Sequence, residues 1–195
     1  NSGTSAWGQK GADIDGEATD DNSGYSVSLN HDGTVVAIGA HDNDDGPGSN
    51  AGHVRVYEYS GSSWSQKGAD IDGEAAGDNS GHSVSLSSDG SIVAIGAIYN
   101  DGTDSNAGHV RVYEYSGGSW SQKGADIDGE ASSDFSGHSV SLSSDGSIVA
   151  IGANLNDGVG SNAGHVRTFV RATLSRNTVL ESSNLGNKIS TTGTS

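Results

Sequence analysis

The sequence contains no cysteine and no methionine, and only nine of its 195 residues are Lys or Arg. Without cysteine, a disulfide framework, a thiolate nucleophile and a zinc–thiolate site are excluded. The net charge is −16, which argues against nucleic acid and anionic lipid as partners, because both are bound through Lys and Arg. No apolar run approaches the ~18 residues of a membrane-spanning helix, so we expect no membrane insertion.

Hydrophobic residues are also scarce, at 31% of the chain, while glycine occurs 31 times. Such a composition taken alone is typical of disorder. The apolar residues, however, lie in short and regularly spaced runs. This arrangement indicates an all-β protein with many short strands and turns.

The chain is organised as three copies of one unit. Three segments recur without change: 49–61 as 105–117, 63–75 as 119–131, and 80–97 as 136–153. The tryptophans Trp7, Trp64 and Trp120 keep nearly the same interval. A fixed period, here of about 56 residues, is the signature of a repeat architecture.

Each unit predicts four antiparallel strands, which in the second copy cover 83–86, 92–97, 109–115 and 120–127. Polar and apolar residues alternate in the first of them, and Asp89-Gly90 is a hairpin signal. The run 92–97 is apolar on both faces, which predicts burial on both. Four strands per unit indicate the blade of a β-propeller. A right-handed β-helix is the alternative, but its coils are shorter and lack hairpins.

The run 80–117 resembles the FG-GAP repeats of integrin alpha-chain propellers and related microbial surface proteins. Ile92–Ala97 and Gly108–Tyr113 carry the likeness, which extends over residues 7 to about 170. The resemblance implies β-propeller-like blades and an extracellular or cell-surface location. Where that family often has an Asp-rich calcium loop, this chain has only Ser87-Ser88-Asp89-Gly90, so the family's calcium site is not carried over.

The repeat predicts a three-blade array over 1–170 and a C-terminal tail over 171–195, which is a docking segment or a linker. Segment 7–15 corresponds to the fourth strand of a unit, so we expect it to complete a blade, in the same chain or in another. Propellers have about four to eight blades, so three are too few to close a ring. We favour pairing between chains, because unpaired strand edges template association. Residues 168–195 have a net charge of +2 against −18 for the rest. Three cations of this tail are the expected assembly residues: Arg171, Arg176 and Lys188.

Acidic residues recur at one place in each repeat and form a candidate calcium site. Alternating carboxylates on a strand share one face, where they could bind a hard cation. The alternative is an exposed strand that its charge keeps soluble. No other cofactor is expected. The candidate ligands are Asp13, Asp15, Glu17, Asp70, Asp72, Glu74, Asp126, Asp128 and Glu130.

The repeated tryptophans Trp7, Trp64 and Trp120 are candidates for stacking on glycans; alternatively, they pack between blades. The repeated histidines are expected to make structural hydrogen bonds. A catalytic nucleophile needs one oriented base at a unique place, and a thrice-repeated site does not provide it. We therefore expect no enzyme. The prediction is a non-catalytic extracellular repeat protein, structural or adhesive, that associates with itself into a larger assembly or filament. A carbohydrate-binding propeller module is the alternative.

Overall fold

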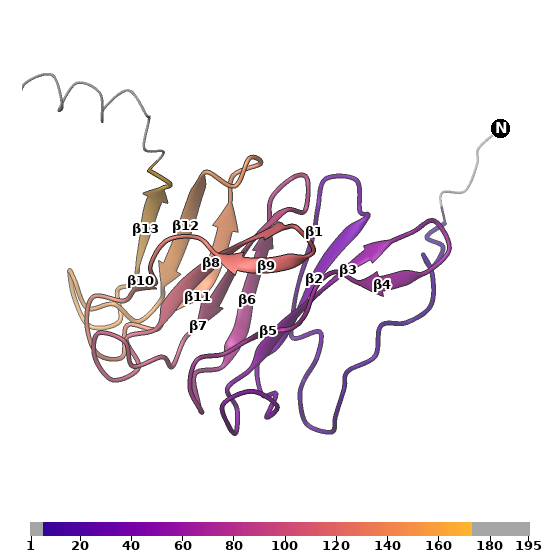
Figure 1. Cartoon of the computed structure of the whole chain (residues 1–195). Helices are drawn as coiled ribbons and strands as arrows, with labels where there is room; N and C mark the ends of the chain where they lie inside the picture. The colour runs from indigo at the N-terminus through magenta and orange to yellow at the C-terminus, as the bar shows by residue number, and fades with distance from the viewer. Residues whose placement is uncertain (1–5, 173–195) are drawn as a thin grey trace, which may run out of the picture.

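The computed structural model describes residues 6–172, which form strands and turns with no helix (Figure 1). Within this range there is accordingly no helix of the length and apolarity needed to cross a membrane. Three antiparallel sheets follow one another along the chain, with the second between the first and the third (Figure 1). The all-β prediction is confirmed.

The first sheet has the order β1-β2-β3-β4, and β5 also pairs with β3. Its strands are β1 (Ser26–Leu29), β2 (Val35–Ala40), β3 (His53–Tyr59), β4 (Trp64–Gln66) and β5 (Ile71–Asp72). The second sheet repeats this order with β6 (Ser80–Leu86), β7 (Ile92–Ala97), β8 (His109–Ser116), β9 (Ser119–Gln122) and β10 (Ile127–Asp128). Within residues 6–172, the third sheet has three strands: β11 (Ser136–Leu142), β12 (Ile148–Ala153) and β13 (His165–Val170).

The predicted fourth strand is split into two short pieces in the first and second sheets. Gly68 and Gly124 lie between the pieces with φ of +82°, a conformation that interrupts a regular strand and that glycine adopts without steric cost. Both pieces still pair with the same third strand. Each complete sheet therefore has the layout of a four-stranded blade.

Segment 7–15 forms no strand within the described part of the single chain. Strands form by pairing, and no strand among residues 6–172 pairs with this segment. Among residues 6–172, β13 pairs only with β12. Segment 7–15 therefore does not complete that sheet within the chain; whether it completes a blade in another chain remains a prediction.

The sheets pack face to face through two apolar clusters. We call the face that packs on the preceding sheet the front face and the opposite one the rear face. The rear face of the first sheet meets the front face of the second in a cluster of Val35, Ala37, Val54, Val56, Ile71, Val84, Leu86, Val93 and Ile95. The second and third sheets meet through Ala94, Val110, Val149 and Ile151.

Glycine permits the sheets to approach closely where β2 passes β6 and where β7 passes β11. A Cβ built on Gly96 would lie 2.1 Å from the backbone oxygen of Gly137 in the next sheet, and one on Gly39 would lie equally close to Gly81. The hydroxyl of Ser83 donates to the same Gly137 oxygen at 2.6 Å. The run Val-Ala-Ile-Gly-Ala is therefore a requirement of packing between sheets.

Candidate functional site

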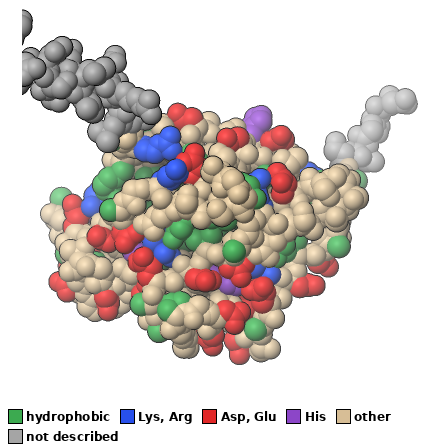
Figure 2. All heavy atoms as spheres, in the orientation of Figure 1, with side chains coloured by type: hydrophobic (Ala, Val, Ile, Leu, Met, Phe, Trp, Pro, Cys, Tyr) green, Lys and Arg blue, Asp and Glu red, His purple; other side chains and the backbone are tan. Residues whose placement is uncertain are grey.

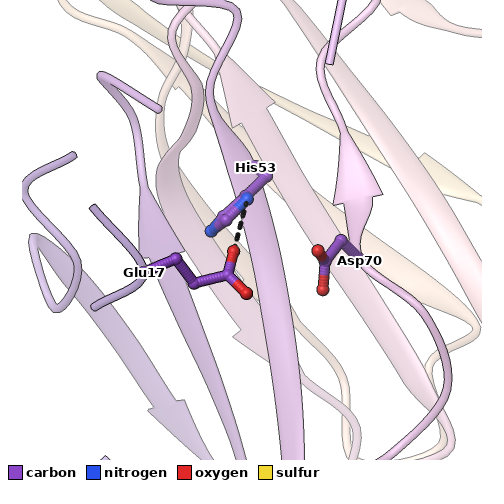
Figure 3. Close-up of side chains that lie close together, drawn as sticks. All are labelled: Glu17, His53 and Asp70. Atoms are coloured by element: carbon purple, nitrogen blue, oxygen red, sulfur yellow. Dashed lines mark ion pairs between the residues drawn. The ribbon is translucent and has the colours of Figure 1, made fainter. Parts of the chain in front are cut away.

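Glu17, His53 and Asp70 lie together beside the first sheet, with one ligand-type atom of each within 4.8 Å of the others (Figure 3). His53 begins β3, Asp70 lies between β4 and β5, and Glu17 belongs to the segment that precedes the sheet. The imidazole is buried, with 1% of its surface exposed. Its Nδ1 faces the Glu17 carboxylate at 3.8 Å, too far for a hydrogen bond, and has no hydrogen-bond partner.

The repeat builds the same cluster a second time from Glu74, His109 and Asp126. Glu74 follows β5 of the first sheet, whereas the other two belong to the second sheet, so the cluster lies where two sheets meet. In the third copy, His165 Nδ1 lies 3.6 Å from Glu130. No third carboxylate joins that pair among residues 6–172.

An arginine accompanies the glutamate in each copy. The guanidinium nitrogens of Arg55 and Arg111 lie 3.4 and 3.6 Å from Glu17 and Glu74. The aspartate of each cluster instead accepts a hydrogen bond from a glutamine side chain, as Asp126 does from Gln122 at 2.6 Å. With a neutral histidine, each three-residue cluster and its arginine retain one negative charge.

Burial and the surrounding charges shift the protonation of the second cluster. Burial lowers the pKa of the His109 imidazole, and the nearby Arg111 guanidinium lowers it further. Burial also raises the pKa of the Glu74 carboxyl, against the opposing effect of Arg111. Both shifts favour the neutral forms of the two side chains.

The donor set of these clusters is one imidazole nitrogen and two carboxylates. Such mixed nitrogen and oxygen ligands suit zinc and related divalent first-row metals, whereas calcium takes six to eight oxygens. Three protein ligands would leave a coordination position open. The clusters could therefore hold a zinc-type ion, and the histidines, which the sequence suggested were structural, are among the possible ligands.

The other acidic candidates do not gather into an oxygen cage. The side chain of Asp13 accepts a hydrogen bond from Gln9 at 2.8 Å. The backbone oxygens of Asp15, Asp72 and Asp128 accept hydrogen bonds from Arg55, Arg111 and Arg167. Asp89, in the turn between β6 and β7, accepts hydrogen bonds from Ser87 and Ser91. Calcium binding by these residues stays a prediction.

Two of the three tryptophans contact neighbouring segments. The indole nitrogens of Trp64 and Trp120 donate hydrogen bonds to the backbone oxygens of Lys10 and Lys67, at 2.8 and 2.6 Å. Trp7 is fully exposed. Of the predicted assembly cations, Arg171 is exposed at the end of β13, while Arg176 and Lys188 lie outside the described residues.

A column of tyrosine and histidine rings at or beside the first strands of the three sheets was not predicted from the sequence. Tyr25 and His82 occupy equivalent repeat positions, and the Tyr25 hydroxyl lies 3.3 Å from Nε2 of His82. His82 also packs against His138, with 5.2 Å between ring centroids, and His41 lies beside Tyr25 at 3.9 Å. The repeat period was visible in the sequence, but the contact between these positions depends on how the sheets stack.

Acidic side chains far outnumber basic ones on the face seen in Figure 2, in agreement with the net charge. Residues 12–57, from the segment before β1 through most of β3, match the family model of the FG-GAP repeat. The chain carries an FG-GAP repeat. Because the later copies repeat the same residues, the FG-GAP pattern continues through β6–β8 and β11–β13. No match was found among curated proteins.

Two solved structures are similar to the chain at low sequence identity. A candidate 6-phosphogluconolactonase of Bacteroides uniformis matches with a TM-score of 0.51 and 12% identity, over 77% of this chain and 37% of that one. The hydrazine synthase of Kuenenia stuttgartiensis matches with a TM-score of 0.46 and 14% identity, over 74% and 33%. The chain thus spans about a third of the length of either protein, and the first likeness concerns the fold alone.

Proposed function

We propose that this FG-GAP repeat chain is a non-catalytic extracellular protein, structural or adhesive, that associates with itself head to tail. The family supports the extracellular, adhesion-type assignment, because FG-GAP repeats usually occur in extracellular or surface proteins. The observation that carries self-association is a pair of open apolar faces, one at each end of the three-sheet array. The two faces are complementary, because each is a copy of a face that is covered inside the array.

The front face of the first sheet exposes Val27 and Leu29, with 64% and 60% of their surfaces accessible. At the equivalent positions of the second sheet, Val84 and Leu86 are 9% and 7% exposed, because the first sheet covers them. The same amino acids are thus buried at one place and open to solvent at the other. Covering them would be favourable by about 25 cal/mol per Å² of apolar surface.

The rear face of the third sheet is open in the same way. Val166 is 70% exposed and Ile148 is 42% exposed, whereas their equivalents Val110 and Ile92 are 0% and 5% exposed. Among the described residues, β13 is also the edge of its sheet, and an unpaired strand edge can template the addition of a strand. A second chain would meet here the surface that the second sheet offers the third.

Light scattering coupled to size exclusion, over a series of concentrations, tests the proposal. The wild-type chain is expected to exceed the monomer mass of 19.6 kDa in steps of whole chains. Val27→Asp and Val166→Asp each place a charge on one open face and should return the mass to that of the monomer. Ser119→Asp is the control, because Ser119 is exposed on the second sheet, which lies between the other two and presents neither open face. A wild-type chain that keeps the monomer mass at every concentration would refute self-association.

A carbohydrate-binding propeller is the second candidate function. Trp7 supports it, since an exposed indole is a ready platform for a sugar ring. Trp64 and Trp120 support it less, because their indole nitrogens bond to neighbouring segments. Glycan-array binding that is lost in Trp7→Ala, while the protein remains monomeric, would favour this candidate.

A further inference from the structure

Each of the first two sheets seats a tryptophan of its fourth strand against the preceding segment. Trp120 donates its indole hydrogen to Lys67, and its ring lies against Gly68, where a Cβ would be only 2.8 Å away. Trp64 repeats the arrangement on Lys10 and Gly11. A backbone oxygen and a glycine thus form a recurring receptor for an indole ring.

No described residue fills the third copy of this receptor. Lys123 and Gly124 occupy the equivalent positions, but the third sheet has no fourth strand among the described residues, and nothing lies within 4 Å of a Cβ on Gly124. A cavity of about 470 Å³ opens there, lined by Lys123, Gly124, Ile127, Leu142, Phe169 and Arg171. Lys123, Gly124 and Arg171 are the repeat equivalents of Lys67, Gly68 and Tyr115, which contact Trp120.

The chain also has a tryptophan without a receptor. Trp7 precedes Trp64 by one repeat, and all of its side chain is exposed. The segment that follows keeps the local form of a fourth strand even though it pairs with no sheet. Its Gln9–Asp13 hydrogen bond repeats Gln122–Asp126, and Arg55 binds the Asp15 backbone oxygen as Arg111 binds that of Asp72.

We propose that residues 7–15 of a second copy add to β13 as the missing fourth strand and place Trp7 in the cavity beside Lys123 and Gly124. This inference rests on the proposed self-association and names its contact. The occupant is a second copy because segment 7–15 already lies on the first sheet as 64–72 lies on the second. Stacking that first sheet behind a third sheet therefore brings its leading segment onto β13, as a continuation of the interface inside the array.

The repeat fixes the register of this contact. Tyr57 pairs with Gln66 and His53 with Asp72 in the first sheet. By equivalence, Phe169 pairs with the second copy's Gln9, and His165 with its Asp15. The second copy's Asp13 then takes the place that Asp70 has in the first cluster and joins Glu130 and His165. The docked pair completes the one cluster that a single chain leaves without its aspartate.

Arg171 lines the cavity at the position that Tyr115 holds beside Trp120, where the ring centroids are 5.2 Å apart. A guanidinium stacks well on an indole face, so Arg171 is a suitable neighbour for the incoming Trp7. This gives a specific contact to one residue of the predicted assembly set. Stacking heterologous faces in this way closes a ring if the rotation permits and otherwise extends a filament.

Trp7→Ala in the full chain is the first test. The side chain is fully exposed, so the fold and thermal stability of the monomer should not change, while self-association measured by light scattering should weaken by at least about tenfold, as for a buried aromatic anchor. A peptide of residues 6–17 should bind the Trp7→Ala chain with a stoichiometry of one in calorimetry. The same peptide with alanine at position 7 is the matched control and should bind at least about tenfold more weakly.

Cysteine cross-linking tests the register, because the chain has no cysteine of its own. Glu58 pairs with Ser65 in the first sheet, so Val170 should face the second copy's Gly8. A chain with Gly8→Cys and Val170→Cys should oxidise to covalent multimers. The control, Gly8→Cys with Val159→Cys, should remain at the monomer mass on denaturing gels.

The outcomes separate this inference from the proposed function. Self-association that Trp7→Ala leaves unchanged would overturn the Trp7 contact and leave self-association standing. Oxidation of the Gly8→Cys/Val170→Cys chain to a disulfide within one chain would show that the segment reaches its own β13, and would also overturn the inference. A wild-type chain that is monomeric throughout would refute the proposed function itself.

Discussion

The side-chain amide of Asn100 donates a hydrogen bond of 2.9 Å to the carboxylate of Asp78, and both residues are buried. Asp78 also accepts from the backbone of Ala75 at 3.1 Å, so it holds the linker between the first and second sheets against the loop after β7. The pair recurs one repeat later as Asn156 and Asp134, at 2.8 Å.

Asn100→Ala should lower the free energy of unfolding by about 2 kcal/mol, because it leaves a buried carboxylate short of one donor. Chemical denaturation followed by circular dichroism measures the change. Ser62→Ala, at an exposed position, is the control and should alter stability by less than about 0.5 kcal/mol. An unchanged midpoint in Asn100→Ala would show that solvent replaces the amide.

Gly96→Ala should destabilise the chain by about 3 kcal/mol or more, because its Cβ would overlap a backbone oxygen of the next sheet, which cannot move without separating the sheets. Gly152→Ala is the matched control at the equivalent position of the third sheet. Its Cβ would meet only the Ser139 side chain, which can change rotamer at about 1 kcal/mol. Equal losses in thermal unfolding of the two variants would contradict this account.

Stability should fall as the pH falls below about 6.5, the ordinary histidine pKa. Burial lowers the pKa of His82 in the folded chain, and the neighbouring His138 and His41 lower it further. The unfolded chain therefore takes up protons first, which favours unfolding until the pH falls below the lowered pKa. Denaturation at pH 8 and pH 5.5 should show a smaller difference for His82→Gln than for wild type. His31→Gln, at an exposed histidine, should keep the full difference.

We expect two zinc ions per chain, one for each complete Glu–His–Asp cluster. Calorimetry should be done on the Trp7→Ala chain, where a docked copy does not add a ligand. Asp70→Asn and Asp126→Asn keep the glutamine hydrogen bond and should each remove one ion, while Asp104→Asn in an exposed loop should remove none. Chelation should lower the melting temperature, because the second cluster joins two sheets. Saturable zinc binding that survives both substitutions together would refute the assignment.

Much of the fold could be predicted because it depends on local patterns. The apolar run 92–97 forms β7 and is buried throughout, and Asp89-Gly90 makes the expected turn, with Gly90 at φ +70°. The behaviour of segment 7–15 could not be predicted in the same way. Its residues resemble those of β4 and β5, and strand formation depends on a pairing partner that lies outside the segment.

Only the acidic residues of the Glu–His–Asp clusters were predicted, because the members of each cluster lie far apart in the sequence. The acidic residues Glu74 and Asp126 were candidates, but nearly a whole repeat separates them in the sequence, and the pairing of β8 with β10 brings Asp126 towards His109. Nothing in the local spacing of His109 indicated this. Likewise, Trp7 belongs to the same repeat pattern as Trp64 and Trp120. Its surroundings differ because no described strand pairs with its segment.

The near identity of the repeated faces bears on how the chain folds. Val84 and Leu86 on the front face of the second sheet have the same chemistry as Val140 and Leu142 on that of the third. The rear face of the first sheet therefore cannot distinguish its proper neighbour from the sheet after it by side-chain chemistry. The length of the linkers must specify the order of the sheets, and refolding at high concentration should produce exchanged arrangements in which one chain's third sheet occupies another chain's second place.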